Sequence, residues 1–194
     1  MVEIDKEFPK AWPFGVIKTV QWLSCLLLLI TLWCTPGYFS GIGFVFFSAW
    51  NLLIVALLSW LGHIFGLQSR LFSIGQSAAC FIPFALIDFF YSILFFIFFA
   101  ISTLICIACL FMSFGYAAAV RLVLGYLFST VFCLAAAGSC AFLTILLYRS
   151  APNGQIMGLR SIVIQGEKTA SFGPSSGPGA YPAASGYPNG TNPV

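Results

Sequence analysis

Residues 89–120 read FFYSILFFIFFAISTLICIACLFMSFGYAAAV and contain no lysine, arginine, aspartate, glutamate or histidine. At about 1.5 Å of rise per residue, one helix of this length would extend about 48 Å, whereas a bilayer core of about 30 Å needs only about 20 residues. The stretch therefore predicts two transmembrane helices that fold back on each other. Glycine and serine interrupt the large apolar residues in Met112–Tyr116, so we expect the turn there.

The composition of the whole chain also indicates a membrane protein. Of its 194 residues, 60% are hydrophobic and 7% are charged, and the mean hydropathy is +1.01. Soluble globular domains average about 25% charged residues, so a soluble core does not explain this deficit. The net charge of +3 is small and scattered. No basic surface with interleaved aromatic residues is apparent, which argues against nucleic acid as a partner.

Four apolar segments are long enough to cross a bilayer, at about residues 14–33, 42–65, 81–110 and 122–148. The predicted fold is all-α, a transmembrane four-helix bundle with short outer loops. Residues 1–13 precede this membrane domain of residues 14–149, and residues 150–194 form a tail. From about residue 170 the tail is rich in Gly, Pro, Ser and Tyr, and we expect it to be disordered. Its short apolar patch, Ser161–Ile164, is expected to lie against the membrane.

Asp88 is the main candidate for a functional residue, because an acidic side chain in a membrane span is costly and often marks a site. Lys18 lies at a similar depth in the first span, and Arg149 closes the fourth span on the same side. We therefore expect an interhelical ion pair near the inner interface, with Lys18 as the first partner and Arg149 as the second. Ion or proton transport through Asp88 and Asn51 remains the alternative.

Two further polar residues lie in the second span. Asn51 is near its middle, where an amide that bonds a neighbouring helix contributes on the order of 1 kcal/mol. His63 is near its inner end, with no Cys, Asp or Glu at ligand spacing, and is expected to be a hydrated interface residue.

The fourth span carries a ridge of small residues that recur every four positions. This small-residue ridge consists of Gly125, Ser129, Cys133, Ala137 and Ala141. Small side chains at this spacing let two helix backbones approach closely, so that van der Waals contact holds them together. We expect the ridge to pack against another helix of the same chain, with self-association of two chains as the alternative.

The sequence contains none of the patterns that indicate catalysis. There is no Ser-His-Asp candidate set, no HExxH, no phosphate-binding loop and no pair of carboxylates at working distance. We therefore expect a protein that is not an enzyme and that has no catalytic residue, no metal site and no cofactor. Cys80, at the inner entry to the third span, is a candidate for palmitoylation, and an unmodified packing cysteine is the equal alternative.

Two segments carry a resemblance to a known family. Pro83–Tyr91, PFALIDFFY, is similar to the acidic-plus-tyrosine opening of the third helix in the MARVEL family, which includes MAL proteolipids, physins and gyrins. Ala117–Tyr126, AAAVRLVLGY, resembles the entry to the fourth helix. The Gly-, Pro- and Tyr-rich tail is similar in kind to the physin and gyrin tails. The resemblance covers about residues 10–150.

This resemblance implies a non-enzymatic role in organising membranes, in vesicle trafficking, membrane apposition, fusion or junctions. The implied partners are membrane lipids and other membrane proteins, with self-association as a further option. The implied location is the plasma membrane or a vesicle membrane. A small transporter or pore subunit that uses Asp88 and Asn51 is the alternative function.

The distribution of basic residues predicts that both termini are cytoplasmic. With that orientation seven of the eight Lys and Arg residues lie inside and only Arg121 lies outside. Protease treatment of sealed vesicles that expose the cytoplasmic face should therefore remove a C-terminal tag. Protection of that tag, or glycosylation of a sequon engineered beside it, would contradict the prediction.

Overall fold

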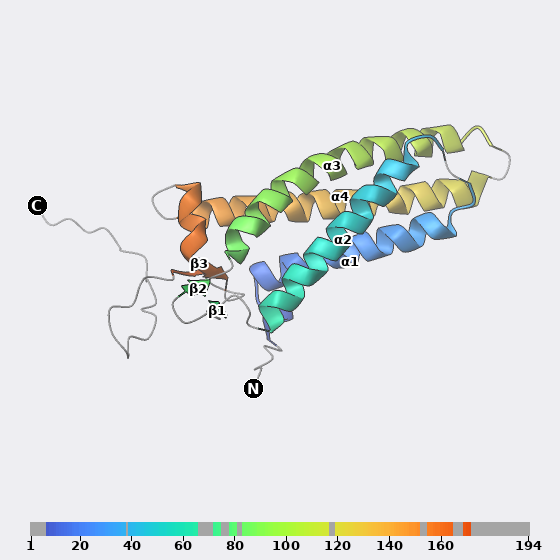
Figure 1. The fold of residues 1–194 in the computed structure, drawn as a ribbon. Coiled ribbons are helices and arrows are strands. Elements are labelled where there is room, and N and C mark those ends of the chain that lie inside the picture. The colour runs from blue at the N-terminus through green and yellow to red at the C-terminus, as the bar shows by residue number, and fades with distance from the viewer. Residues whose placement is uncertain are drawn as a thin grey trace, which may run out of the picture.

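The computed structural model describes residues 7–37, 39–65, 72–74, 78–80, 83–116, 119–151, 155–164 and 169–171. Its core is four long helices: α1 (Phe14–Cys34), α2 (Ile42–Ile64), α3 (Phe84–Ser113) and α4 (Ala119–Ser150). They lie side by side as an elongated bundle (Figure 1). All four are long and apolar enough to cross a membrane, so the chain is an integral multi-pass membrane protein with the predicted fold.

The helix ends differ from the predicted ones by a few residues. The predicted third span began at 81, whereas α3 begins at Phe84, after Pro83, whose carbonyl accepts the bonds from the Leu86 and Ile87 N–H groups. Proline has no N–H to give to a preceding turn, so it suits this first position. The other end of α3 extends to Ser113, and the chain turns at residues 114–116, within the predicted turn.

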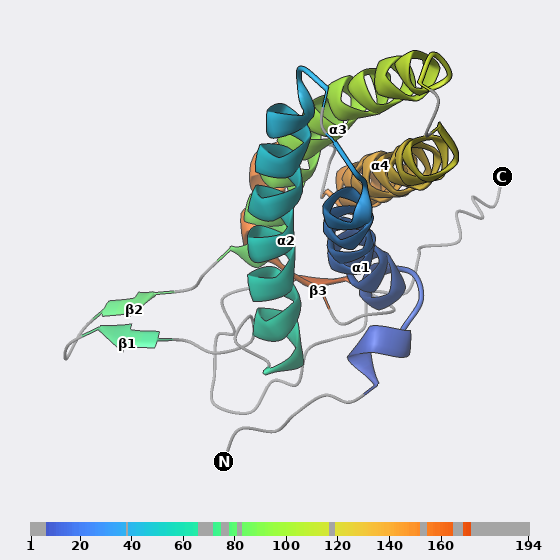
Figure 2. The ribbon, with the colours of Figure 1, turned by 90° about the vertical axis from the view of Figure 1, so that its right-hand side faces the viewer.

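Short elements surround one end of the bundle. The 3₁₀ helices η1 (Phe8–Lys10) and η4 (Ile156–Ser161) flank the helical region. Two antiparallel hairpins pair β1 (Phe72–Ile74) with β2 (Ala78–Cys80), and β3 (Ile162–Ile164) with β4 (Thr169–Ser171). Neither hairpin was predicted, because three-residue strands leave no period in the sequence. The β1–β2 hairpin projects away from the four helices (Figure 2).

The predicted position of the apolar patch in Ser161–Ile164 is wrong. Leu159, Ile162 and Ile164 are buried, and they share a hydrophobic cluster with residues of α1, α3 and α4. That cluster also contains Phe14, Ile17, Ala85, Phe89, Leu143, Leu147 and Ala151. The patch therefore packs against the end of the bundle, because the helix ends supply an apolar surface on which its side chains are buried.

The small-residue ridge of α4 faces the inside of the bundle. Ser129 and Cys133 are fully buried and Ala137 is 7% exposed, while Gly125 and Ala141 are half-buried. A methyl group added at Gly125 would overlap the side chain of Thr35, which shows how closely α1 and α4 approach there. Further along the ridge the Ser129 hydroxyl lies 3.4 Å from that of Thr31.

The contacts of α4 follow one antiparallel register. Thr35 meets Gly125, Thr31 meets Ser129, and Gln21 reaches Cys140, so residue numbers that fall along α1 pair with numbers that rise along α4. On the neighbouring side, the Cys133 sulfur lies 3.9 Å from that of Cys106 in α3. The ridge thus contacts both α1 and α3, and it allows α4 to occupy the space between them.

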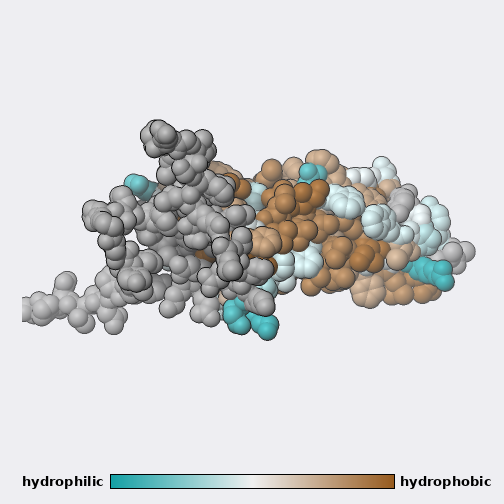
Figure 3. All heavy atoms as spheres, turned by 60° about the horizontal axis from the view of Figure 1, so that its bottom comes forward, coloured by the Kyte–Doolittle hydropathy of each residue, from teal (hydrophilic) through white to brown (hydrophobic). Residues whose placement is uncertain are grey.

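The outward surface is apolar and aromatic. Large side chains that point away from the bundle include Leu58, Phe90, Leu104, Phe111 and Phe142. Hydrophobic side chains cover most of the described helical surface seen in Figure 3. In water such a surface would cause aggregation, but in a bilayer it contacts lipid chains.

Replacing Ala137 by phenylalanine should destabilise the bundle, because the larger ring has no space between α4 and its neighbours. Overpacking of this kind typically costs about 1–3 kcal/mol. The matched control is Leu134→Phe on the same helix, since Leu134 is 56% exposed. Thermal unfolding in detergent measures both variants. Equal tolerance of the two substitutions would show that the ridge does not form a close helix contact.

Candidate functional site

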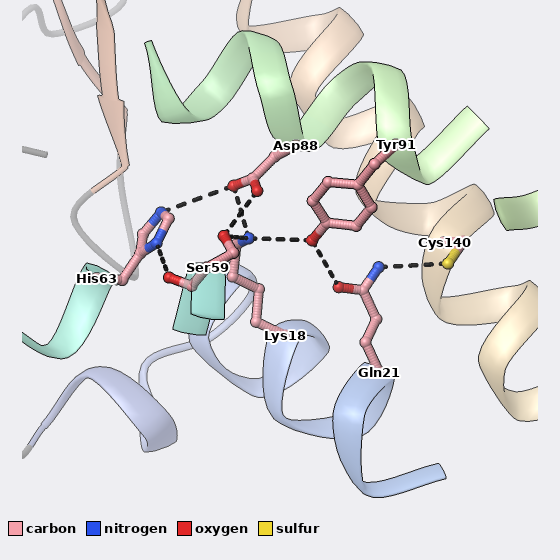
Figure 4. A network of polar contacts seen from close by, with 7 residues as sticks. All are labelled: Lys18, Gln21, Ser59, His63, Asp88, Tyr91 and Cys140. Carbon is pink, nitrogen blue, oxygen red and sulfur yellow. Dashed lines mark hydrogen bonds and ion pairs between the residues drawn. The ribbon is translucent and has the colours of Figure 1, made fainter. Parts of the chain in front are cut away.

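Seven polar side chains form a continuous network inside the bundle (Figure 4). They come from all four long helices and are joined by hydrogen bonds and ion pairs. The members of this polar network are Lys18, Gln21, Ser59, His63, Asp88, Tyr91 and Cys140. Each of them is buried. The network lies in the half of the bundle near η1 and η4.

The centre of the network is the ion pair of Lys18 and Asp88. The Lys18 Nζ lies 2.6 Å from Asp88 Oδ2, and the side chains are 0% and 1% exposed. The ammonium group has three donors, and it also donates to Ser59 Oγ at 2.7 Å and to Tyr91 OH at 3.3 Å. Ser59 in turn donates to Asp88 Oδ1 at 2.7 Å, so each carboxylate oxygen has a partner.

A second branch of the network links the ion pair to α4. The Tyr91 hydroxyl donates to Gln21 Oε1 at 3.2 Å, and Gln21 Nε2 donates to the Cys140 sulfur at 3.4 Å. Every donor in this branch points to a group that can accept. The branch ends at a thiol, which is a weak acceptor.

His63 closes the network on the side of η1. Its Nδ1 lies 2.7 Å from the Ser59 carbonyl oxygen, and because a carbonyl only accepts, this nitrogen carries the proton. The other ring nitrogen, Nε2, faces Asp88 Oδ2 at 3.7 Å. The ring lies between Phe8, with ring centres 5.1 Å apart, and Phe84, at 5.6 Å. The expectation of a hydrated His63 is therefore wrong, since Phe8 and Phe84 cover it.

Helix geometry explains how α1, α2 and α3 each supply two members of the polar network. Lys18 and Gln21 are three residues apart on α1, and Asp88 and Tyr91 are three apart on α3. Ser59 and His63 are four apart on α2. Residues at these spacings share one helix face. Each of these three helices therefore turns one polar face toward the same point, and this spacing is the signal by which their missed members can be found.

The network is electrically balanced at its centre. One ammonium and one carboxylate cancel, and the remaining members are neutral hydrogen-bonding groups. Removing a charge from water is expensive, and a buried pair offsets this only with good geometry and satisfied hydrogen bonds. The ion pair is short at 2.6 Å, the ammonium also donates to Ser59 and Tyr91, and Ser59 donates to Asp88 Oδ1, while Asp88 Oδ2 makes ion-pair contacts and no hydrogen bond with the residues described. The arrangement is suited to fixing helices in place.

Two predicted members do not belong to the network. Arg149 is exposed at the end of α4, and among the described residues the ion pairs of Asp88 are with Lys18 and His63. The fully buried Lys18 already occupies the space beside the carboxylate. Asn51 is wrong as an interhelical contact, because its Nδ2 donates at 2.7 Å to the Phe47 carbonyl of its own helix.

The structure shows no chemistry beyond this network in the part of the chain it describes. Those residues include no group of three or more His, Cys, Asp and Glu side chains placed to hold a metal ion. Cys80 ends β2, but its side chain lies outside the described residues, so its palmitoylation stays a prediction. Comparison with protein-family models, with curated proteins and with solved structures finds no match.

Asp88→Leu should destabilise the protein strongly, because it leaves the Lys18 ammonium buried without its counter-charge. Breaking a buried pair costs about 3–5 kcal/mol in soluble proteins. The double variant Lys18→Met/Asp88→Leu should regain most of this loss, since no charge remains unpaired. Thermal unfolding of the wild type, both single variants and the double variant measures the coupling.

Asn51→Leu is the matched control for these variants, because it also replaces a polar side chain within a span, and the Asn51 amide bonds a carbonyl of its own helix. Its expected cost is small. If the double variant is no more stable than Asp88→Leu, so that the losses of stability in the two single variants simply add, the ion pair does not stabilise the protein.

Proposed function

We propose that this chain is a MARVEL-like tetraspan protein that organises membranes through lipid and protein contacts and catalyses no reaction. Its settings would be vesicle trafficking, membrane apposition, fusion or junctions. Both termini would lie in the cytoplasm, and the membrane would be the plasma membrane or that of a vesicle. The observation that carries the proposal is the balanced, buried network around Asp88.

The network supports a structural role because the groups of its ion pair are occupied by one another. The three donors of Lys18 and both oxygens of Asp88 have partners within the bundle. A transport site must exchange such partners for its cargo, and an ion pair of 2.6 Å resists that exchange. In such a protein the outer surface, rather than the interior, would carry the function.

The outer surface supports the same proposal. The exposed faces of α3 and α4 carry large aromatic side chains, among them Phe90, Phe96, Phe128 and Phe142. Aromatic rings offer a large contact area with few torsions to fix, which favours contacts with lipids and other membrane helices. A bundle with a rigid interior and an aromatic exterior is suited to holding neighbouring molecules.

One observation favours the second candidate, a small transporter or pore subunit. The polar groups from His63 to Cys140 form one series of contacts, in which His63 Nε2 and Asp88 Oδ2 are 3.7 Å apart, and series of polar groups that include acids and histidines carry protons in pumps. In that case Asp88 would exchange a proton with His63. Asn51 would not take part, because its amide bonds its own helix.

Vesicles reconstituted with the full chain separate the two functions. We expect the chain to cluster vesicles above the protein-free level, as measured by light scattering, without collapsing an imposed pH gradient. The double variant Lys18→Met/Asp88→Leu should cluster vesicles as the wild type does, because it keeps the outer surface. Proton flux that is lost in this variant would establish the transporter instead, and wild-type vesicles that fail to cluster would overturn the proposed function.

A further inference from the structure

A cavity lies at the end of the bundle opposite the polar network. It is about 320 Å³ in volume and is open on one side. The connection from α1 to α2 and the region from the end of α3 to the start of α4 form its walls. The lining residues are Pro36, Gly37, Phe39, Tyr116 and Leu122. Neither the ion pair nor the hydrophobic cluster that contains Leu159, Ile162 and Ile164 contributes to it.

Aromatic rings form the core of this cavity. The ring centres of Phe39 and Tyr116 are 5.7 Å apart, and the planes are inclined by 56°. Phe39 also packs against Tyr126, and the centres of these two rings are 5.6 Å apart. The Tyr126 hydroxyl donates to the Gly37 carbonyl at 3.1 Å, which fixes the connection between α1 and α2. Tyr116 lines the cavity and is 56% exposed.

The charges around the cavity restrict its ligand. The chain has no Asp or Glu between residues 8 and 87 or between 89 and 166, so neither segment that forms this end carries a carboxylate. An ammonium group with N–H donors would find no acidic partner here. A quaternary ammonium group needs none, because it has no N–H donor and is attracted by the faces of aromatic rings.

A basic residue lies at the same end of the bundle as these rings. Arg121 is exposed in the first turn of α4 and directly precedes Leu122 of the cavity wall in the sequence. Guanidinium groups bind phosphate oxygens in pairs, and the start of a helix adds a partial positive charge. A ligand that carries a quaternary ammonium and a phosphate within one short group matches this arrangement at both ends.

We propose that this cavity binds the choline headgroup of a phospholipid in the leaflet opposite η1 and η4. The trimethylammonium group lies against Phe39 and Tyr116, and the phosphate pairs with Arg121. The acyl chains then follow the apolar outer surface, to which Phe111 and Val120 contribute. This inference deepens the proposed function by naming a lipid class, and it rests on that function only for its biological use.

Lipid retention by the full chain tests the site. The protein is reconstituted in nanodiscs with equal parts of phosphatidylcholine, phosphatidylethanolamine and phosphatidylglycerol, and bound lipids are counted by native mass spectrometry. Two rings that face the quaternary ammonium should enrich phosphatidylcholine over phosphatidylethanolamine by roughly tenfold. Equal retention of these two lipids would overturn the proposal.

Variants locate the effect. Tyr116→Leu keeps an apolar side chain but removes the ring, and it should abolish the preference, whereas Tyr116→Phe should keep it. The matched control is Phe114→Leu, since Phe114 is a 63% exposed aromatic residue that does not line the cavity. Loss of the preference in Phe114→Leu would mean that any aromatic residue at the membrane interface produces it, and this would overturn the proposed site. Arg121→Gln should lower the retention of both zwitterionic lipids and leave their ratio unchanged.

The two proposals fail separately. Tyr116→Leu leaves the polar network intact, so its melting temperature should match that of the wild type, and a folded variant that keeps the lipid preference contradicts the site alone. Vesicle clustering that is absent while the lipid preference is present contradicts the proposed function alone.

Discussion

The contact between Lys18 and Asp88 is the constraint on which the rest of the bundle depends. An ion pair of 2.6 Å leaves little freedom to the helices that carry it, because either charge alone would be buried in an apolar medium. Ser59 bonds both groups, so α2 is fixed at the same point as α1 and α3. Through Tyr91 and Gln21 the network reaches Cys140 and includes α4. The network around this contact therefore joins all four helices.

Close packing makes this contact possible. The hydrophobic effect does not hold helices together in lipid, so van der Waals contact between small residues must do so. Gly125 and Ser129 let α4 approach α1 at one end, where Thr35 and Thr31 meet them. At the other end the same register brings Cys140 to Gln21. The small-residue ridge and the polar network thus both join α1 to α4, at different depths in the bundle.

The spans and the central pair could be predicted because each has a strong signal. Long apolar segments predict spans by length alone, and charges are so rare within them that Asp88 and Lys18 stand out. Ser59, Gln21, Tyr91 and Cys140 were missed because uncharged polar residues are common in membrane helices, and His63 was expected to be hydrated. Their roles depend on the rotation of each helix, which Asp88 defines only after its partner is known. Arg149 was a plausible partner by depth, yet depth does not specify which face of α4 points inward.

The two ends of the bundle differ in a way that follows from these contacts. At the end near η1 and η4, the polar network and the buried patch of Leu159, Ile162 and Ile164 fill the space between helices, and Phe8 covers His63. At the opposite end the helices are joined by short segments, and the rings of Phe39 and Tyr116 border an open cavity. A ligand that binds there meets a connection already held by the Tyr126 hydroxyl, so less conformational freedom is lost on binding. The proposed selection among lipids therefore depends on rings whose positions are set before the lipid arrives.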